Sequence, residues 1–482
     1  MNVSLVRPYW RIPQSYYPPV VTEPLGLEYL ASAIREEHNV SILDCLAEDY
    51  NGWSKNDFVT DNYNRKIVHI GLKNKQITKK IKKFNPEAVG IGYDFFPQLP
   101  CANEISQLTK KVNKDIIVIA GGPQASSDPD TILERDNSVD IVNIGEGEIT
   151  FKELLDKKFR NLKDIKGIAY KKKGKVIKTK PRPPIMNLDT IAFPARDLVP
   201  FNTYSKLGRI RGKSRTVDKI INLPIIANIR DKIFKLRFPR ANILTSRGCP
   251  NHCYFCSVHN VWGHKYRMRS ASNVLEEINQ LVNNYNVKSL YIQDDNFTIS
   301  KKRTLEICKG LEKLDITYTM PSGVYIPSLD KEILESIKKS GCTSLYFGIE
   351  NGNEKYLNDI TQKKLDLNQV HKVITECKNI GITTTGYFIL GMLGETKQTM
   401  KDTINFAITS KLDKVRLYTC MPIPGSRLYK DCIKQNAIKN FDPLNMMVQS
   451  DMPSIESDKF SIQDVLKLKN TAKKKLKDRD AT

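Results

Sequence analysis

Two long runs of alternating strands and helices set the strongest limit on how this 482-residue chain can fold. Short apolar segments that end in glycine or a polar residue recur between residues 3 and 145, and amphipathic helical patterns separate them. Such strands are typical of a parallel sheet, because each parallel pair needs a long crossover connection. The first run therefore predicts an α/β fold, a doubly wound (Rossmann-like) sheet whose ligands bind beyond the carboxyl ends of the strands.

The second run begins near residue 241 and has longer helices between its strands. Repeated βα units of this kind predict a partial or full (β/α) barrel, with its chemistry on the loops that follow the strands. Prolines and a basic stretch separate the two runs. We expect four segments: an α/β domain over 1–155, a linker with a β-hairpin and a basic amphipathic insertion over 156–240, a barrel over 241–435, and a Lys-rich helical tail over 436–482.

Three cysteines stand close together at the start of the second run. Cys249, Cys253 and Cys256 have the spacing C-x-x-x-C-x-x-C. Three thiolates can hold three irons of a [4Fe–4S] cluster and leave the fourth iron open, whereas most such clusters have four cysteine ligands. A structural zinc ion is the alternative, with His252 or His259 as the fourth ligand.

The cysteine trio, with Phe255 just before its last member, resembles the radical S-adenosylmethionine (SAM) enzymes. The stretch 257–267 and the opening motif Thr22-Glu23-Pro24-Leu25-Gly26 resemble the cobalamin-dependent branch of that family. The resemblance implies that the open iron chelates SAM, and that one electron then cleaves SAM to a 5′-deoxyadenosyl radical. It also implies three cofactors, a [4Fe–4S] cluster, SAM and cobalamin, and an external one-electron reductant of the flavodoxin or ferredoxin type.

The same resemblance assigns residues to the cofactors. Asp294 or Asp295 would receive the SAM ammonium group, Glu350 would approach the ribose or methionine end, and Gly391 and Gly394 would lie near adenine. Each acidic residue could instead be an ordinary helix cap. Near cobalamin the resemblance places Gly26, Gly121, Gly122, Gly145 and Glu146, and the supporting residues expected around the reacting groups are Tyr93, Arg267 and Tyr291.

The chain departs from many cobalamin proteins in one respect, because it has no Asp-x-His-x-x-Gly motif. Cobalamin would therefore bind with its nucleotide tail detached and without a histidine on cobalt. We expect His38 and His69 to be ordinary surface or core residues.

The resemblance favours methylation of an unactivated carbon. Cobalamin would take a methyl group from one SAM, and a second SAM would provide the radical that abstracts a substrate hydrogen. One alternative is a cyclase or rearrangement enzyme that uses cobalamin only as an electron carrier. Another is a non-catalytic, metal-bound scaffold. A methylthiotransferase is disfavoured because we find no second set of cluster-binding cysteines.

The net charge of +23 comes mostly from lysines spread over helix faces, which is typical of a solvated surface. No nucleic-acid motif is present, so we expect a small-molecule or lipid substrate and no nucleic acid. The basic insertion at 205–240 favours packing on the barrel, with an anionic membrane surface as the alternative. No long apolar run or signal-peptide pattern is present, which predicts a cytoplasmic protein, membrane-associated only if the insertion binds lipid.

Overall fold

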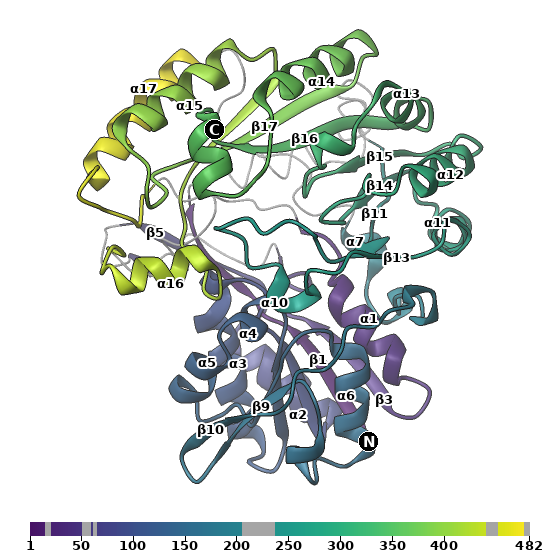
Figure 1. Cartoon of the computed structure of the whole chain (residues 1–482). Coiled ribbons are helices and arrows are strands. Elements are labelled where there is room, and N and C mark those ends of the chain that lie inside the picture. Colours follow the sequence, from purple (N-terminus) through teal and green to yellow (C-terminus); the bar gives the residue numbers. More distant parts are fainter. Residues whose placement is uncertain (15–20, 51–58, 61–64, 205–236, 440–451, 477–482) are drawn as a thin grey trace. The chain divides into compact units, whose positions relative to one another are not determined.

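The computed structural model describes residues 1–14, 21–50, 59–60, 65–204, 237–439 and 452–476 (Figure 1). The chain divides into two compact units, each with its own parallel sheet. Met1–Met186 and Thr190–Ala241 form the first unit, and Asn187–Asp189 and Asn242–Thr482 form the second. Of the predicted basic insertion, 205–236 lies outside the described residues.

The first unit is built on a seven-stranded sheet with the order β10-β9-β8-β7-β6-β1-β3. The pairs from β3 to β8 are parallel, and Val3 of β1 stands beside Val40 on one side and Ala88 on the other. The strands of this sheet are β1 (Asn2–Arg7), β3 (Asn39–Asp44), β6 (Ala88–Gly92), β7 (Ile117–Gly121), β8 (Ile141–Asn143), β9 (Ile168–Lys172) and β10 (Lys175–Lys178).

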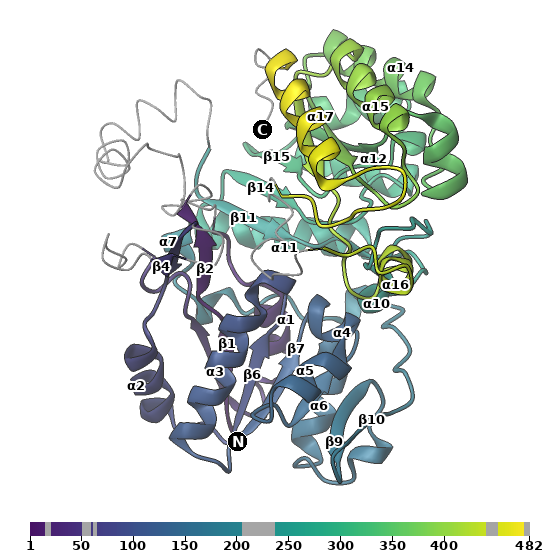
Figure 2. The ribbon, with the colours of Figure 1, turned by 90° about the vertical axis from the view of Figure 1, so that its left-hand side faces the viewer.

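Helices cover both faces of this sheet, so the predicted doubly wound α/β fold is confirmed. Figure 2 shows α2 and α3 on one side of the strands and α6 on the other. Phe151 of α6 packs so closely on the sheet that a Cβ on Gly90 would come within 3.1 Å of its ring. The helices of this unit are α1 (Leu25–Ile34), α2 (Asn74–Phe84), α3 (Leu99–Val112), α4 (Pro123–Ser127), α5 (Pro129–Arg135), α6 (Gly147–Asp156) and α7 (Phe201–Tyr204).

The β-hairpin formed by β9 and β10 extends this first sheet. Asn143 of β8 pairs with Ile168 of β9 in antiparallel fashion, and Lys175 pairs with Lys172 within the hairpin. The hairpin therefore completes one edge of the sheet of the first unit. A small antiparallel sheet, β2 (Trp10–Pro13), β5 (Lys66–Ile70) and β4 (Val59–Thr60), also belongs to this unit.

The second unit is an open barrel of six strands in the order β11-β14-β15-β16-β17-β18. The neighbours from β14 to β18 are parallel, and among the described strands β18 pairs only with β17. The predicted partial barrel is thus confirmed. Its strands are β11 (Arg240–Ile243), β14 (Ser289–Ile292), β15 (Thr317–Met320), β16 (Cys342–Glu350), β17 (Thr383–Leu390) and β18 (Lys414–Thr419), with the short pair β12 (Ser246–Arg247) and β13 (Arg267–Met268) beside them.

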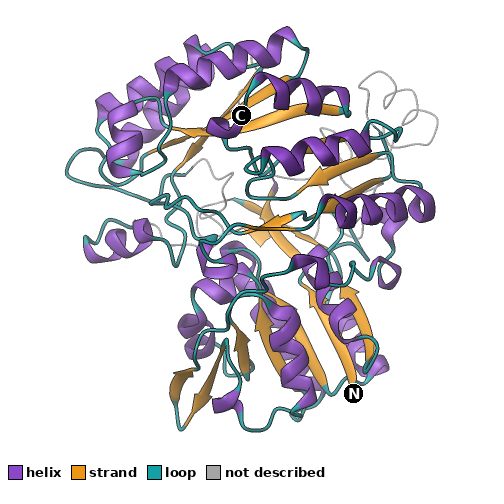
Figure 3. Cartoon of the chain, turned by 45° about the vertical axis from the view of Figure 1, so that its right-hand side comes forward, coloured by secondary structure: helices purple, strands orange, loops and turns teal. Residues whose placement is uncertain are grey.

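Helices lie along the outer side of this open barrel (Figure 3). Several begin at a side chain that accepts a hydrogen bond from the first turn, as Ser270 does for α11 and Thr396 for α15. None of the helices in the described ranges combines the length and apolar character that crossing a lipid bilayer requires. The helices of this unit are α10 (His259–Trp262), α11 (Ala271–Tyr285), α12 (Lys301–Leu311), α13 (Lys331–Lys339), α14 (Leu367–Asn379), α15 (Lys397–Thr409), α16 (Arg427–Lys434) and α17 (Ile462–Lys475).

Candidate functional site

The cysteine loop begins directly after β12 in the second unit. Gly248 has φ +87°, and a Cβ there would lie 2.3 Å from the carbonyl oxygen of Lys265, so only glycine fits at this turn. All ten cysteines of the chain are free thiols. Seven of them are buried, and the three that are partly exposed are Cys249, Cys253 and Cys256. The three partly exposed thiols are therefore the same three that have the C-x-x-x-C-x-x-C spacing.

Segments that follow other strands of the barrel hold the cysteine loop. The amide of Tyr254 donates to the carbonyl of Thr361 (2.9 Å), and its own carbonyl accepts from the amide of Leu428 (3.0 Å). The Asn296 side chain, after β14, donates to the sulfur of Cys249 (3.0 Å). A hydrogen bond to sulfur favours the thiolate, which is the form that binds iron.

The geometry around the loop does not favour the zinc alternative. Two ligands of one zinc ion lie at most about 4.6 Å apart, since Zn–S bonds are about 2.3 Å long. Within the described part of the chain, three potential ligand atoms come within 4.8 Å of one another only at Glu37, His38 and Asp156, in the other unit. The rings of His252 and His259 each stack on His264, at 4.1 and 3.7 Å between centroids.

The two aspartates after β14 have different surroundings. Asp294 is buried, and its carboxylate accepts from the amide of Thr245 (2.6 Å) and the hydroxyls of Thr245 and Ser246, which fixes the turn before the cysteine loop. Asp295 has no hydrogen bond or ion pair among the described residues. Burial, with a contribution from the Asp294 charge, raises the pKa of Asp295 to about 7. A desolvated carboxylate without a partner is suited to bind a cation.

Glu350 ends β16 in a strained conformation. Its φ is +69°, and the pairing of β16 with β17 shifts register between Gly348 and Glu350. One carboxylate oxygen lies 3.3 Å from Nζ of Lys363, and this ammonium lies 6.0 Å from the centre of the Phe255 ring in the cysteine loop. Sequence reasoning found Glu350 and Phe255 but missed Lys363, which has no motif of its own.

In the loop after β17, packing against another helix explains one of the two glycines predicted to lie near adenine. A Cβ on Gly391 (φ +79°) would lie 3.0 Å from the side chain of Val465 in α17. Gly394 (φ +91°) has only ordinary neighbours, 3.6 Å away. Thr396, and not the neighbouring Glu395, caps the helix that follows this loop. Glu395 is buried and accepts from Asn351 (2.7 Å), which joins the loops after β16 and β17.

Arg267 and Tyr291, the predicted supporting residues of the second unit, differ in burial. Arg267 is buried, and its guanidinium donates to the carbonyl of Trp262 (2.8 Å), so it holds the segment that follows the cysteine loop. Tyr291 is partly buried on β14.

A row of tyrosines on the barrel strands was not predicted. The rings of Tyr346, Tyr387 and Tyr418 follow one another across β16, β17 and β18, with centroids 5.8 and 6.0 Å apart. Phe388, next to Tyr387 on β17, contacts Phe406 of α15. Because neighbouring side chains of a strand point to opposite faces, the tyrosines lie on the face turned away from α15. One tyrosine in each of three consecutive predicted strands was the available signal.

A buried ion pair ties together the strand ends of the first unit. The Arg7 guanidinium at the end of β1 donates to both carboxylate oxygens of Asp44 at the end of β3, and the Tyr204 hydroxyl donates to the same carboxylate (2.6 Å). Arg7 also donates to the carbonyl of Thr22 (2.6 Å). The opening motif is therefore anchored at the carboxyl edge of the sheet.

The glycines at this edge are of two kinds. A Cβ on Gly122 (φ +103°) would lie 2.8 Å from the Asp94 carboxylate, so packing alone requires glycine there. Gly26 has no atom within 4 Å of such a Cβ, and Gly121 has only Asn143 at 3.9 Å. Phe95, which follows β6, is 60% exposed. Open backbone at Gly26 and Gly121 leaves room for a bulky ligand such as cobalamin to approach closely.

The other residues predicted near cobalamin have internal contacts. Tyr93 is buried, with its hydroxyl 3.1 Å from Asn103, and burial raises its pKa. Gly145 (φ +83°) donates its amide to Ser126 (3.0 Å). Glu146 accepts from the amide of Ile185 (3.0 Å). These contacts stabilise the loops that follow β6 and β8.

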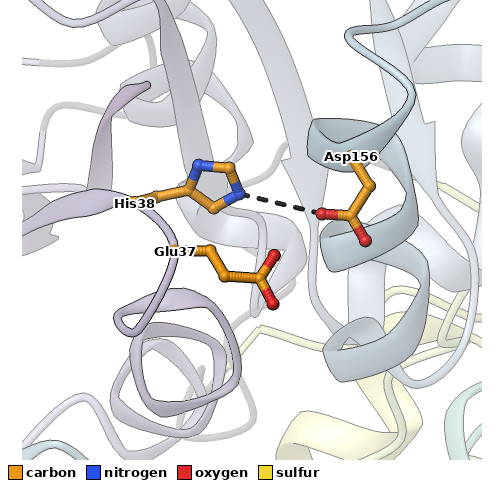
Figure 4. Close-up of side chains that lie close together, drawn as sticks. All are labelled: Glu37, His38 and Asp156. Atoms are coloured by element: carbon orange, nitrogen blue, oxygen red, sulfur yellow. Dashed lines mark ion pairs between the residues drawn. The ribbon is translucent and has the colours of Figure 1, made fainter.

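Neither histidine of the first unit lies at the carboxyl edge of its parallel sheet. His38 directly precedes β3, at the opposite edge, and Figure 4 shows it beside Glu37 and Asp156. The His38 ring is 4.0 Å from the Asp156 carboxylate, and Lys152 pairs with both acidic residues. His69, on β5 of the small sheet, stacks on Tyr9 at 4.3 Å.

Comparisons with known proteins identify both units. The family model of the radical SAM superfamily matches residues 243–407, and that of the B12 binding domain matches residues 18–155. An uncharacterized methyltransferase of Pyrococcus horikoshii is 34% identical over 419 residues, covering 86% of this chain and 79% of the relative. Cytidylyl-2-hydroxyethylphosphonate methyltransferase of Streptomyces wedmorensis is 27% identical over 459 residues, covering 89% and 81%.

The fold also has solved counterparts. The radical SAM methyltransferase TsrM from Kitasatospora setae, determined with cobalamin and a [4Fe–4S] cluster bound, superposes with a TM-score of 0.65. It is 17% identical in sequence, and the match covers 90% of this chain and 78% of TsrM. Fold, cysteine loop and both family matches together define a radical SAM enzyme with a cobalamin domain. The chain belongs to the cobalamin-dependent radical SAM family, whose cofactors are a [4Fe–4S] cluster, SAM and cobalamin.

Proposed function

We propose that this enzyme methylates an unactivated carbon of a small-molecule or lipid substrate. The observation that carries the proposal is the presence, on one chain, of a loop with three accessible thiols and a glycine-lined sheet edge without a histidine. When bound, the cluster and SAM supply a radical that removes a substrate hydrogen, and cobalamin supplies the methyl group. The methyltransferase names of two relatives agree with this reaction.

In the second unit, Cys249, Cys253 and Cys256 would hold the cluster. Asp295, rather than Asp294, would pair with the SAM ammonium, because the Asp294 carboxylate already accepts hydrogen bonds from Thr245 and Ser246. Ion pairing would also favour the ionised form of Asp295 over the protonated form that burial favours.

Glu350 would accept hydrogen bonds from the SAM ribose or lie near its methionine end, since a carboxylate can accept two hydroxyl hydrogens at once. Gly394 would leave backbone room near adenine. The tyrosine row would border the substrate with apolar ring faces and hydroxyl groups.

In the first unit, Gly26 and Gly121 would let the backbone approach cobalamin closely. Gly122, Gly145 and Glu146 would act indirectly, through the loop geometry that they stabilise. The electron would come from an external flavodoxin- or ferredoxin-type reductant.

The test needs no substrate. Anaerobically reconstituted protein is incubated with reduced cobalamin and SAM, and S-adenosylhomocysteine and 5′-deoxyadenosine are quantified. We expect S-adenosylhomocysteine to form in proportion to cobalamin, and none to form in a cobalamin-free control. Deoxyadenosine without S-adenosylhomocysteine would support ring formation or rearrangement instead. Protein that binds metal but forms neither product would support a non-catalytic, metal-bound scaffold.

A further inference from the structure

The segment after β16 has an unusual backbone. Tyr356–Ile360 forms a π-helical turn, and Gln362 (φ +56°) and Lys364 (φ +52°) are both in the left-handed region. Left-handed backbone at non-glycine residues is unfavourable, and π-turns and strained residues concentrate at functional sites. The two strained residues flank Lys363, so the segment sets the direction of this one side chain.

Lys363 is directed at the cysteine loop. Its ammonium lies 3.3 Å from Glu350 and 6.0 Å from the Phe255 ring centre, and its side chain is 20% exposed. Burial by itself lowers the pKa of Lys363, but the charges of Glu350 and Cys253 outweigh it, and the pKa lies above its ordinary value.

The same segment is bonded to the loop that it faces. The carbonyl of Thr361 accepts from the amide of Tyr254, between two of the cysteines. The Arg427 guanidinium donates both to Gln362 (2.9 Å) and to the carbonyl of His252. The position of Lys363 relative to the cysteine loop is therefore held by contacts of the two residues that precede it.

We propose that Lys363 sets the reduction potential of the cluster held by Cys249, Cys253 and Cys256. The inference rests on the proposed assignment of these cysteines as ligands. A reduced cluster carries one more negative charge than the oxidised cluster, so a fixed cation nearby stabilises the reduced form. Charge interactions are strong in a partly dry site. Glu350 offsets part of this effect while it holds the ammonium in place.

The experiment compares Lys363→Met with Lys364→Met in the full-length chain. Lys364 is exposed, is the next residue in the chain and loses the same charge, so it serves as the control. Each protein is loaded with iron and sulfide and titrated with dithionite, without SAM, cobalamin or substrate, while the reduced cluster is followed by electron paramagnetic resonance. At the wild-type midpoint, we expect Lys363→Met to lower the reduced-to-oxidised ratio about tenfold, equal to about 59 mV for one electron.

Lys364→Met should change that ratio less than twofold, and Glu350→Gln should change it in the opposite direction from Lys363→Met. Equal ratios for the two lysine variants would overturn the proposal. If Lys363→Met binds fewer irons than wild type, Lys363→Arg decides the question. If Lys363→Arg has the iron content and reduction potential of the wild type, the positive charge has the proposed role. If it has neither, the proposal is overturned. Because this experiment does not measure methyl transfer, a result that overturns the role of Lys363 does not contradict the proposed methylation.

Discussion

At the scale of single residues, Asp294 and Asp295 show how neighbouring carboxylates acquire different tasks. Asp294→Asn removes one of two acceptor oxygens, so donors from Thr245 or Ser246 lose their partner. A buried donor without a partner costs about 1–3 kcal/mol. We therefore expect Asp294→Asn to lower the melting temperature of the apoprotein.

Asp295→Asn should keep or raise that melting temperature, because it removes a buried group that ionises without a partner. In cluster-loaded protein it should weaken SAM binding at least tenfold, as measured by calorimetry. Similar melting temperatures for the two variants, both below wild type, would contradict this division of roles.

At the scale of elements, helix α1 carries a buried acid that makes stability depend on pH. Glu28 is fully buried, and neither of its carboxylate oxygens has a hydrogen-bond partner among the described residues. Burial, followed by the charge of Glu23, raises the pKa of Glu28 to about 8. Between pH ~4.5 and 8 the folded chain therefore holds a proton that the unfolded chain has lost. Stability should fall as the pH rises through this window.

Glu28→Gln cannot ionise, so it should melt near wild type at pH 5 and above wild type at pH 8.5. The effect is on the order of a few kcal/mol, since each pKa unit corresponds to about 1.4 kcal/mol. Thermal melts at both pH values test it, with exposed Glu36→Gln as the control. Parallel pH profiles for wild type and Glu28→Gln would show that Glu28 does not carry the pH dependence.

Helix α17 gives a structural reason for Gly391, which the sequence predicted to lie near the adenine of SAM. Gly391→Ala should destabilise the second unit by about 1–3 kcal/mol, through its φ of +79° and its approach to Val465. Adding Val465→Ala should relieve the crowding but not the backbone strain. Chemical denaturation of the single and double variants measures this, and a purely additive double variant would contradict the contact.

The parts of the fold that depend on local pattern could be predicted from the sequence. Strand-helix alternation indicates both parallel sheets, and glycine with charged neighbours indicates the hairpin at 168–178. Its attachment to β8 and the contact of Glu395 with Asn351 depend on residues far apart in sequence. Lys363 was missed for the same reason, since its position depends on a π-turn and two left-handed residues that no spacing rule indicates.

At the scale of the whole molecule, the chain has two units with separate cores. Replacement of Cys249, Cys253 and Cys256 by alanine should abolish iron binding without unfolding the first unit. We expect the triple variant to bind cobalamin within about threefold of wild-type affinity, since a threefold change corresponds to less than 1 kcal/mol. Absorbance titration with cobalamin checks this. Loss of cobalamin binding would mean that the first unit requires an intact cysteine loop.

The contrast between three accessible and seven buried thiols has a practical consequence. An alkylating reagent reaches thiols in proportion to their exposure, so the cluster-free chain should gain three adducts quickly and the other seven only on unfolding. Iron would shield those three. The mass spectrum of the labelled protein would then give the fraction of molecules in a preparation that carry a cluster.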